Sequence, residues 1–171
     1  GRYVEARMLW GDLVNVSRDL ASRVLHTLKP TTAVDCAERE RAVRLVRTFP
    51  RTVKYHLSVD GFNEDVDIRG CSDADVLGAK DARLRDELAV IWTEEEAYGP
   101  AGAPPGAEGP KPDTNFADRL LREEVRSRPL WVIQELGEVV SRARARGSAG
   151  PVEASILDNR ILAYNNVLGA M

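Results

Sequence analysis

Few residues of this chain have the types and spacing that metal binding or catalysis requires. The stretch 65–70 (Asp-Val-Asp-Ile-Arg-Gly) resembles the start of a calcium-binding loop. However, Arg69 stands where such a loop needs an oxygen ligand, and Val76 stands where it needs a bidentate glutamate. We therefore interpret this stretch as a solvated loop and expect no metal site in it.

The histidines and cysteines offer no stronger candidate. His26 and His56 fall on different predicted helices, with no second His or Cys at ligand spacing. Cys36 and Cys71 are too few for a disulfide framework or a zinc quartet, so they indicate free thiols in a reducing compartment; one disulfide between them is the less favoured alternative. No phosphate-binding glycine loop and no Ser, Cys and His grouping is visible. We predict that the chain is not an enzyme and has no cofactor. An enzyme whose site forms only when distant residues come together in the fold is a third hypothesis, after the two given below.

Composition limits the remaining function classes. The chain has 171 residues, 43% of them hydrophobic and 30% charged, which suits one globular region with a core. Its 24 Lys and Arg residues are balanced by 27 Asp and Glu residues, which does not indicate a basic patch, so we expect no nucleic-acid partner. Apolar runs such as 88–92 fall far short of the roughly 18 residues of a membrane helix. Both ends continue helical patterns, without a signal peptide or start methionine, so we expect a fragment.

Hydrophobic spacing predicts an all-α fold built from long amphipathic helices. The clearest helix is 4–28, whose apolar residues between 9 and 28 fill half of the helical wheel and should touch more than one neighbour. Further helices are expected over 35–57, 82–98, 114–127, 129–147 and 151–168. No stretch alternates with a period of two for long enough to predict a sheet.

Several local signals set the expected boundaries. Asp35 followed by Glu38 predicts a capping box, and Pro50 predicts a kink in the second helix. Residues 60–81 are polar and turn-rich, and 99–112 is almost entirely Gly, Pro and Ala, which predicts a disordered insertion within a single region spanning 1–171. Pro129 suits the first position of a helix, where its missing N–H costs nothing.

The opening residues resemble the bestrophin family of anion channels. Residues 2–21 follow the family pattern of Arg, two aromatics, Glu, a small residue, Arg, two variable residues, Trp-Gly, then Leu-Val-Asn, one variable residue, Ser-Arg, one variable residue and Leu-Ala. Val4 departs from it where the family has its second aromatic. Segments 129–136 and 165–170 are similar to two later family helices, and the variant looks closest to the bacterial, plant and algal branch. The matching positions of the first motif are Glu5, Arg7, Trp10, Gly11, Asn15, Ser17 and Arg18.

This resemblance implies passive transport of chloride and other small anions through a homopentameric pore. The chain would be the cytosolic or stromal helical region of a multi-pass membrane protein, and segments before Gly1 and after Met171 would cross the lipid bilayer. The motif residues of 2–21 would serve packing and subunit contacts. Calcium control cannot be inferred, because the family's calcium-binding residues lie downstream of this chain.

An apolar constriction at the cytosolic end of the pore maps to Leu130 or, with a shifted alignment, to Trp131, Val132 or Ile133. Arg126 and Arg128 precede this helix start, whose unpaired N–H groups also favour anions, and would form a positive vestibule. From the residues alone, a Leu130 packed in a core is the simpler reading. The alternative function is a soluble helical scaffold or interaction module that docks through the apolar face of 9–28.

Overall fold

The computed structural model describes residues 2–57, 73–93, 115–122, 125 and 127–171, and these residues are helical with short connections. The helices are α1 (Arg2–Thr27), α2 (Ala33–Leu57), α3 (Asp73–Thr93), α4 (Phe116–Leu120), α5 (Arg128–Arg146) and α6 (Pro151–Ala170). No strand occurs in the described part of the chain, so the predicted all-α fold is confirmed.

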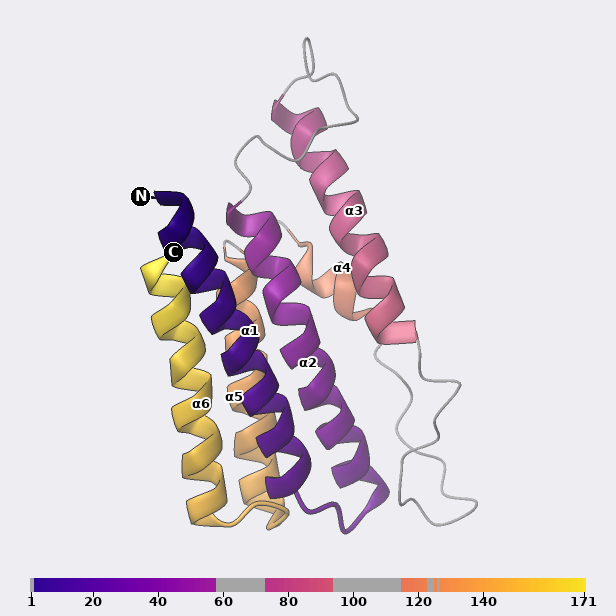
Figure 1. The fold of residues 1–171 in the computed structure, drawn as a ribbon. Coiled ribbons are helices and arrows are strands. Elements are labelled where there is room, and N and C mark those ends of the chain that lie inside the picture. Colours follow the sequence, from indigo (N-terminus) through magenta and orange to yellow (C-terminus); the bar gives the residue numbers. More distant parts are fainter. Residues whose placement is uncertain (1, 58–72, 94–114, 123–124, 126) are drawn as a thin grey trace.

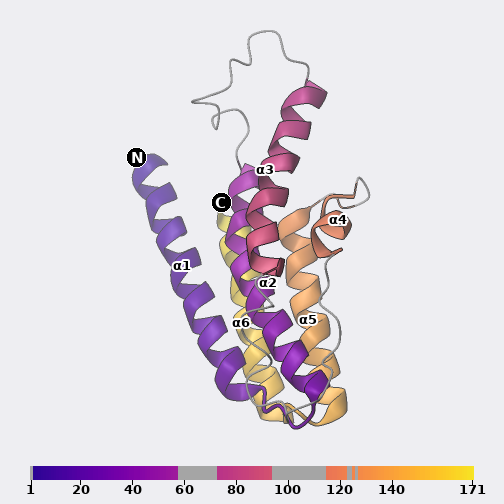
Figure 2. The ribbon, with the colours of Figure 1, turned by 90° about the vertical axis from the view of Figure 1, so that its right-hand side faces the viewer.

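Helices α1, α2, α5 and α6 form an antiparallel four-helix bundle, and α3 lies along α2 with the short α4 beside it (Figures 1 and 2). Both chain ends lie at one end of the bundle, which we call the terminal end (Figure 1). The α1–α2 and α5–α6 turns lie at the opposite end, which we call the turn end. Helix α5 therefore starts at the terminal end, whereas α6 starts at the turn end.

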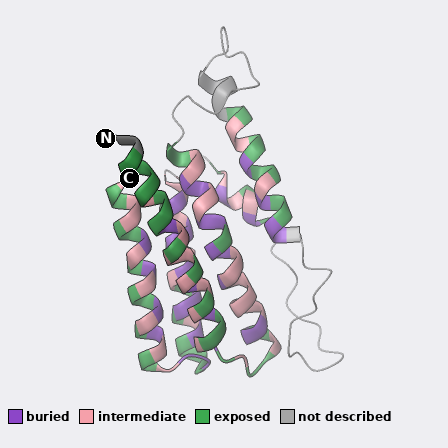
Figure 3. Cartoon of the chain, viewed as in Figure 1, coloured by how far each residue is buried: buried purple, intermediate pink, exposed green. Residues whose placement is uncertain are grey.

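The core lies between the four bundle helices and continues under α3 and α4. Buried faces point inward along each helix, and exposed residues line the outside (Figure 3). The rings of Phe49 in α2 and Tyr164 in α6 stack at 4.0 Å between centroids. The fully enclosed side chains include Leu13, Leu20, Leu45, Phe49, Leu84, Leu88, Leu136, Leu157 and Tyr164. This burial explains the apolar spacing of the predicted helices.

Two predicted boundaries were wrong. Helix α3 begins at Asp73, inside the stretch 60–81 that was predicted to be turns. The acidic residues at this start made the stretch look like a loop, although acidic groups stabilise the amino end of a helix. Helix α4 spans only Phe116–Leu120 instead of 114–127. Helix α2 continues through Pro50 to Leu57.

The predicted insertion 99–112, the loop 65–70 and Cys71 lie outside the described residues, whereas Cys36 is a buried free thiol.

The capping box at the start of α2 lies three residues earlier than predicted. The N–H of Asp35 donates to Thr32 Oγ1 at 3.1 Å, and the N–H of Thr32 donates to Asp35 Oδ2 at 3.1 Å. Thr32 is thus the cap and Asp35 its partner, which is the reciprocal arrangement of such a box. Glu38, the expected partner, instead accepts two hydrogen bonds from Arg142 of α5.

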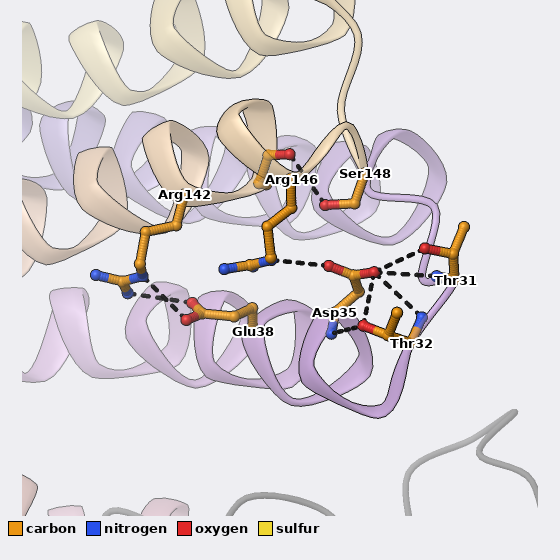
Figure 4. A network of polar contacts seen from close by, with 8 residues as sticks. Thr31, Thr32, Asp35, Glu38, Arg142, Arg146 and Ser148 are labelled. Atoms are coloured by element: carbon orange, nitrogen blue, oxygen red, sulfur yellow. Dashed lines mark hydrogen bonds and ion pairs between the residues drawn. The ribbon is translucent and has the colours of Figure 1, made fainter.

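Asp35 also ties the two turns together (Figure 4). Its Oδ2 accepts hydrogen bonds from both Thr31 and Thr32, and its Oδ1 accepts one from Arg146 Nε of α5 at 3.0 Å. Close by, the N–H of Lys29 donates to the carbonyl of Ser148 at 3.0 Å. Burial alone would raise the pKa of Asp35, but the hydrogen bonds from Arg146, Thr31 and Thr32 outweigh it and hold the pKa well below the usual 3.8.

A depressed carboxyl pKa stabilises the fold above pH 3.8 and loses that contribution as the pH falls below it. We expect Asp35→Asn to cost about 2–4 kcal/mol of unfolding free energy at pH 7, because Arg146 loses its buried partner. The gap to wild type should begin to shrink below pH 3.8, because Asp35 takes up a proton in the unfolded chain before it does so in the fold. Urea unfolding followed by circular dichroism measures both values. The matched control Glu38→Gln, in a more exposed pair, should cost about 1 kcal/mol or less, and a gap that does not change with pH would contradict this account.

Candidate functional site

The start of α5 carries the candidate constriction. Ser127 precedes the helix in extended backbone and makes no side-chain cap, and Pro129 occupies its first turn. Pro129 is thus the second residue of the helix and not the first, which was the predicted position. The first N–H groups of the helix are left without a side-chain acceptor from Ser127, so the partial positive charge of this end is not offset by a cap.

The four predicted constriction residues differ in exposure. Leu130 exposes 48% of its surface, whereas Val132 exposes none and Ile133 exposes 7%. Trp131 is partly buried and packs against the core. Val132 and Ile133 therefore fill the interior of this bundle, and Leu130 is the one of the four whose side chain is largely open to solvent.

Arg128, predicted to attract anions, carries its own counter-ion. Its Nη1 lies 2.6 Å from Asp81 Oδ1 of α3, and its Nη2 donates to Asp81 Oδ2 at 2.9 Å. The Nη2 contact is a charge-assisted hydrogen bond, whereas the contact to Asp81 Oδ1 is a close ion pair without hydrogen-bond geometry. The charge that Arg128 would add to a vestibule is thus largely balanced within the chain. The other predicted cation, Arg126, lies outside the described residues.

An aromatic cluster, which the sequence did not suggest, holds the start of α5 against α3 and α4. Phe116 stacks on Trp92 with 3.8 Å between ring centroids, and its other neighbour is Trp131, at 5.3 Å. Trp92 Nε1 also donates to Thr48 Oγ1 of α2 at 3.2 Å. These aromatic residues are far apart in the sequence, so no local pattern could have joined them. Their contacts hold the start of α5, next to Leu130, against α3 and α4.

Six of the seven motif residues of α1 are exposed: Glu5, Arg7, Trp10, Gly11, Asn15 and Arg18. At about 100° per residue, Arg7, Gly11 and Arg18 lie within about 40° of one another on the helix. Leu13, Leu20 and Val24, which are buried against the bundle, lie on the other side. We call the stripe of Arg7, Gly11, Arg18 and Leu25 the outer face of α1.

Ser17 is the motif residue that α1 turns inward. Its Oγ donates to the carbonyl of Leu13 at 2.8 Å and accepts a hydrogen bond from the Tyr164 hydroxyl at 3.0 Å. Burial raises the pKa of Tyr164, more than the hydrogen bond to Ser17 lowers it, so the phenol stays neutral in the fold. This contact joins α1 to α6.

Comparison with known proteins then identifies the family. Residues 1–103 match the family model of the bacterial and fungal bestrophin proteins. The chain therefore belongs to the bestrophin family, whose members are membrane anion channels and not enzymes. The similar segments 129–136 and 165–170 lie outside the matched residues. Neither a curated protein nor a solved structure matches the chain. Among the described helices, none is both long and apolar enough to cross a membrane.

The Ser17–Tyr164 hydrogen bond predicts unequal costs for its two partners. Ser17→Ala leaves the fully buried Tyr164 hydroxyl without an acceptor and should cost about 1–3 kcal/mol of unfolding free energy. Tyr164→Phe removes that hydroxyl while Ser17 keeps its bond to Leu13, so we expect a cost of about 1 kcal/mol or less. The double variant should be more stable than Ser17→Ala alone in urea unfolding. Simple additivity of the two costs would show that the two side chains are not coupled.

Proposed function

We propose that this chain is the helical region, on the cytosolic or stromal side, of a channel that conducts chloride and other small anions passively through a homopentameric pore. The observation that carries the proposal is the family match over residues 1–103, which contains α1, α2 and α3. Five copies of the bundle would surround the pore outside the bilayer.

The outer face of α1 supports assembly with further copies. Helix α1 packs against α2 and α6 on one side, and Leu25 on its outer face is an exposed apolar residue. A Cβ added at Gly11 would meet no atom within 4 Å, so nothing inside this chain requires glycine there. Glycine costs helix stability relative to alanine, and it allows another backbone to come close. A neighbouring subunit on the outer face accounts for both features.

The position of the chain ends supports the orientation. Both lie at the terminal end of the bundle (Figure 1), so segments that cross the bilayer would attach on the same side. In this orientation the terminal end faces the membrane and the turn end faces away from it. The full-length protein should then carry apolar spans of about 20 residues on both sides of this region.

Two helix starts are candidates for the apolar constriction. Leu130 follows Pro129 at the terminal end and is the position favoured by the family resemblance. Val152 follows Pro151 in the first turn of α6 at the turn end, and 70% of its surface is exposed. Its exposure makes Val152 the alternative position, at the end of the bundle opposite to Leu130. Either residue, repeated by fivefold symmetry, would form an apolar ring that conducts when it is wetted.

Conductance of the full-length protein in planar bilayers tests this function and separates the two positions. We expect chloride currents from the wild type, and we expect Leu130→Ala to raise single-channel conductance about twofold or more, because a wider apolar ring wets more readily. Val152→Ala is the matched control, since it alters an equivalent proline-led helix start at the other end.

Each outcome of this comparison has a definite meaning. A response to Val152→Ala alone assigns the constriction to the turn end and contradicts the Leu130 assignment. Unchanged currents in both variants would remove the constriction from these helix starts. Absence of any anion current from the wild type would defeat the channel proposal and favour the helical interaction module. The apolar face of 9–28, which was predicted to be its docking surface, is packed inside the bundle at Leu13, Leu20 and Val24, so such a module would have to dock through the outer face of α1.

Gly11→Ala should act in opposite directions on the chain and on the assembly. In the chain alone it should raise unfolding free energy by roughly 0.5–1 kcal/mol, because Cβ lowers backbone entropy in the unfolded state. In the full-length protein it should reduce the pentamer fraction by at least half, because the added methyl separates two packed surfaces. Multi-angle light scattering in detergent measures that fraction.

Gly137→Ala in α5 is the matched control, because its Cβ would also meet nothing within 4 Å. It should stabilise the chain to a similar extent and leave the pentamer fraction unchanged. Equal pentamer fractions for both variants would place the subunit contact elsewhere.

A further inference from the structure

The pair of Arg128 and Asp81 places an acidic side chain at the start of α5, one of the two helix starts that the proposed function offers for the apolar constriction. Asp81 comes from α3 and Arg128 is the first residue of α5, so the contact joins two elements 47 positions apart in the sequence. The side chains expose 22% and 27% of their surface for Arg128 and Asp81 respectively. Water and small ions can therefore reach the pair.

The geometry lets Asp81 act as a bound anion would. Its two oxygens lie 2.6 and 2.9 Å from two guanidinium nitrogens, and the second contact is a hydrogen bond of the kind that a bound oxyanion accepts from arginine. While this contact holds, the pair has no net charge. A mobile anion must then displace Asp81 or pass an Arg128 whose charge is already balanced, where the helix dipole still attracts it.

Helix α3 is held in place by contacts that do not involve Arg128. Glu87 accepts hydrogen bonds from Lys54 Nζ at 3.0 Å and from Tyr55 Oη at 2.7 Å, both from α2. Further along α3, Trp92 packs on Phe116 and bonds to Thr48. Asp81 is therefore presented by a docked helix, and its position does not depend on the ion pair itself.

We propose that Asp81 is a tethered counter-ion that lowers anion flow past the start of α5 by neutralising Arg128. The inference rests on the proposed channel function and adds a residue that sets conductance. Removing the carboxylate while keeping side-chain size should expose the charge of Arg128 in every subunit. The local chloride concentration would then rise, and the effect should fade as salt screens the added charge.

The test compares chloride conductance of the full-length channel in bilayers at low and high salt. Asp81→Asn should raise single-channel conductance about twofold at roughly 0.05 M KCl and change it little at about 1 M, where the Debye length is only about 3 Å. Asp86→Asn removes the same charge from an exposed position of the same helix and should leave both values near wild type. Arg128→Gln should lower the low-salt conductance, and the Asp81→Asn, Arg128→Gln double variant should return it to near wild type.

The outcomes separate this inference from the function on which it rests. A wild type that conducts, with an Asp81→Asn conductance equal to it at low salt, overturns the counter-ion role and leaves the channel intact. An increase of the same size at both salt concentrations also overturns it, because a charge effect must be screened. No current from the wild type defeats the channel proposal itself. If Asp81→Asn fails to assemble, the Arg128→Gln variant and the double variant decide the question. Recovery of the low-salt conductance in the double variant supports the inference. A low-salt conductance that stays as low as in Arg128→Gln overturns it.

Discussion

Helix α1 is packed on one side only, and this constraint governs how the chain can work. Leu13, Leu20, Val24 and Leu28 are buried against the bundle, while Trp10 and Leu25 on the same helix expose 39% and 51% of their surface. Six of the seven family motif residues of α1 are also exposed. The chain thus folds around its own core, and we propose that the outer face of α1 contacts a neighbouring subunit.

The turn end supplies the rigidity that this arrangement needs. Asp35 connects the start of α2 to the end of α5 through Arg146, and Lys29 connects the two turns through Ser148. These contacts keep the four helices antiparallel and in register. Because the helices alternate in direction, the two proline-led helix starts, at Leu130 and Val152, lie at opposite ends of the bundle. The ion pathway of a fivefold assembly could be lined at either end, and the position of a constriction is therefore decided by topology as much as by residue type.

The sequence correctly predicted the helices whose apolar spacing and whose capping or proline residues indicate the same boundaries. The long amphipathic α1, the proline start of α6 and the all-α fold were all predicted correctly from periodicity and capping chemistry, and the start of α5 was predicted to within one residue. It placed the capping box three residues too late, because Asp35 and Glu38 satisfy the same spacing rule as Thr32 and Asp35. The burial of Val132 and Ile133 and the pairing of Arg128 with Asp81 could not be predicted, since each depends on a partner distant in the sequence. The same holds for the stack of Trp92, Phe116 and Trp131.

The central claim is that the outer face of α1 is buried between identical subunits around one pore. A cryo-electron microscopy structure of the full-length protein in lipid nanodiscs tests it most directly. The account predicts five copies about one axis, with Arg7, Gly11 and Arg18 of each copy in contact with a neighbour and the terminal end of each bundle facing the bilayer. Particles in which these three residues are open to solvent, or in which the chain occurs as a single copy, would contradict it.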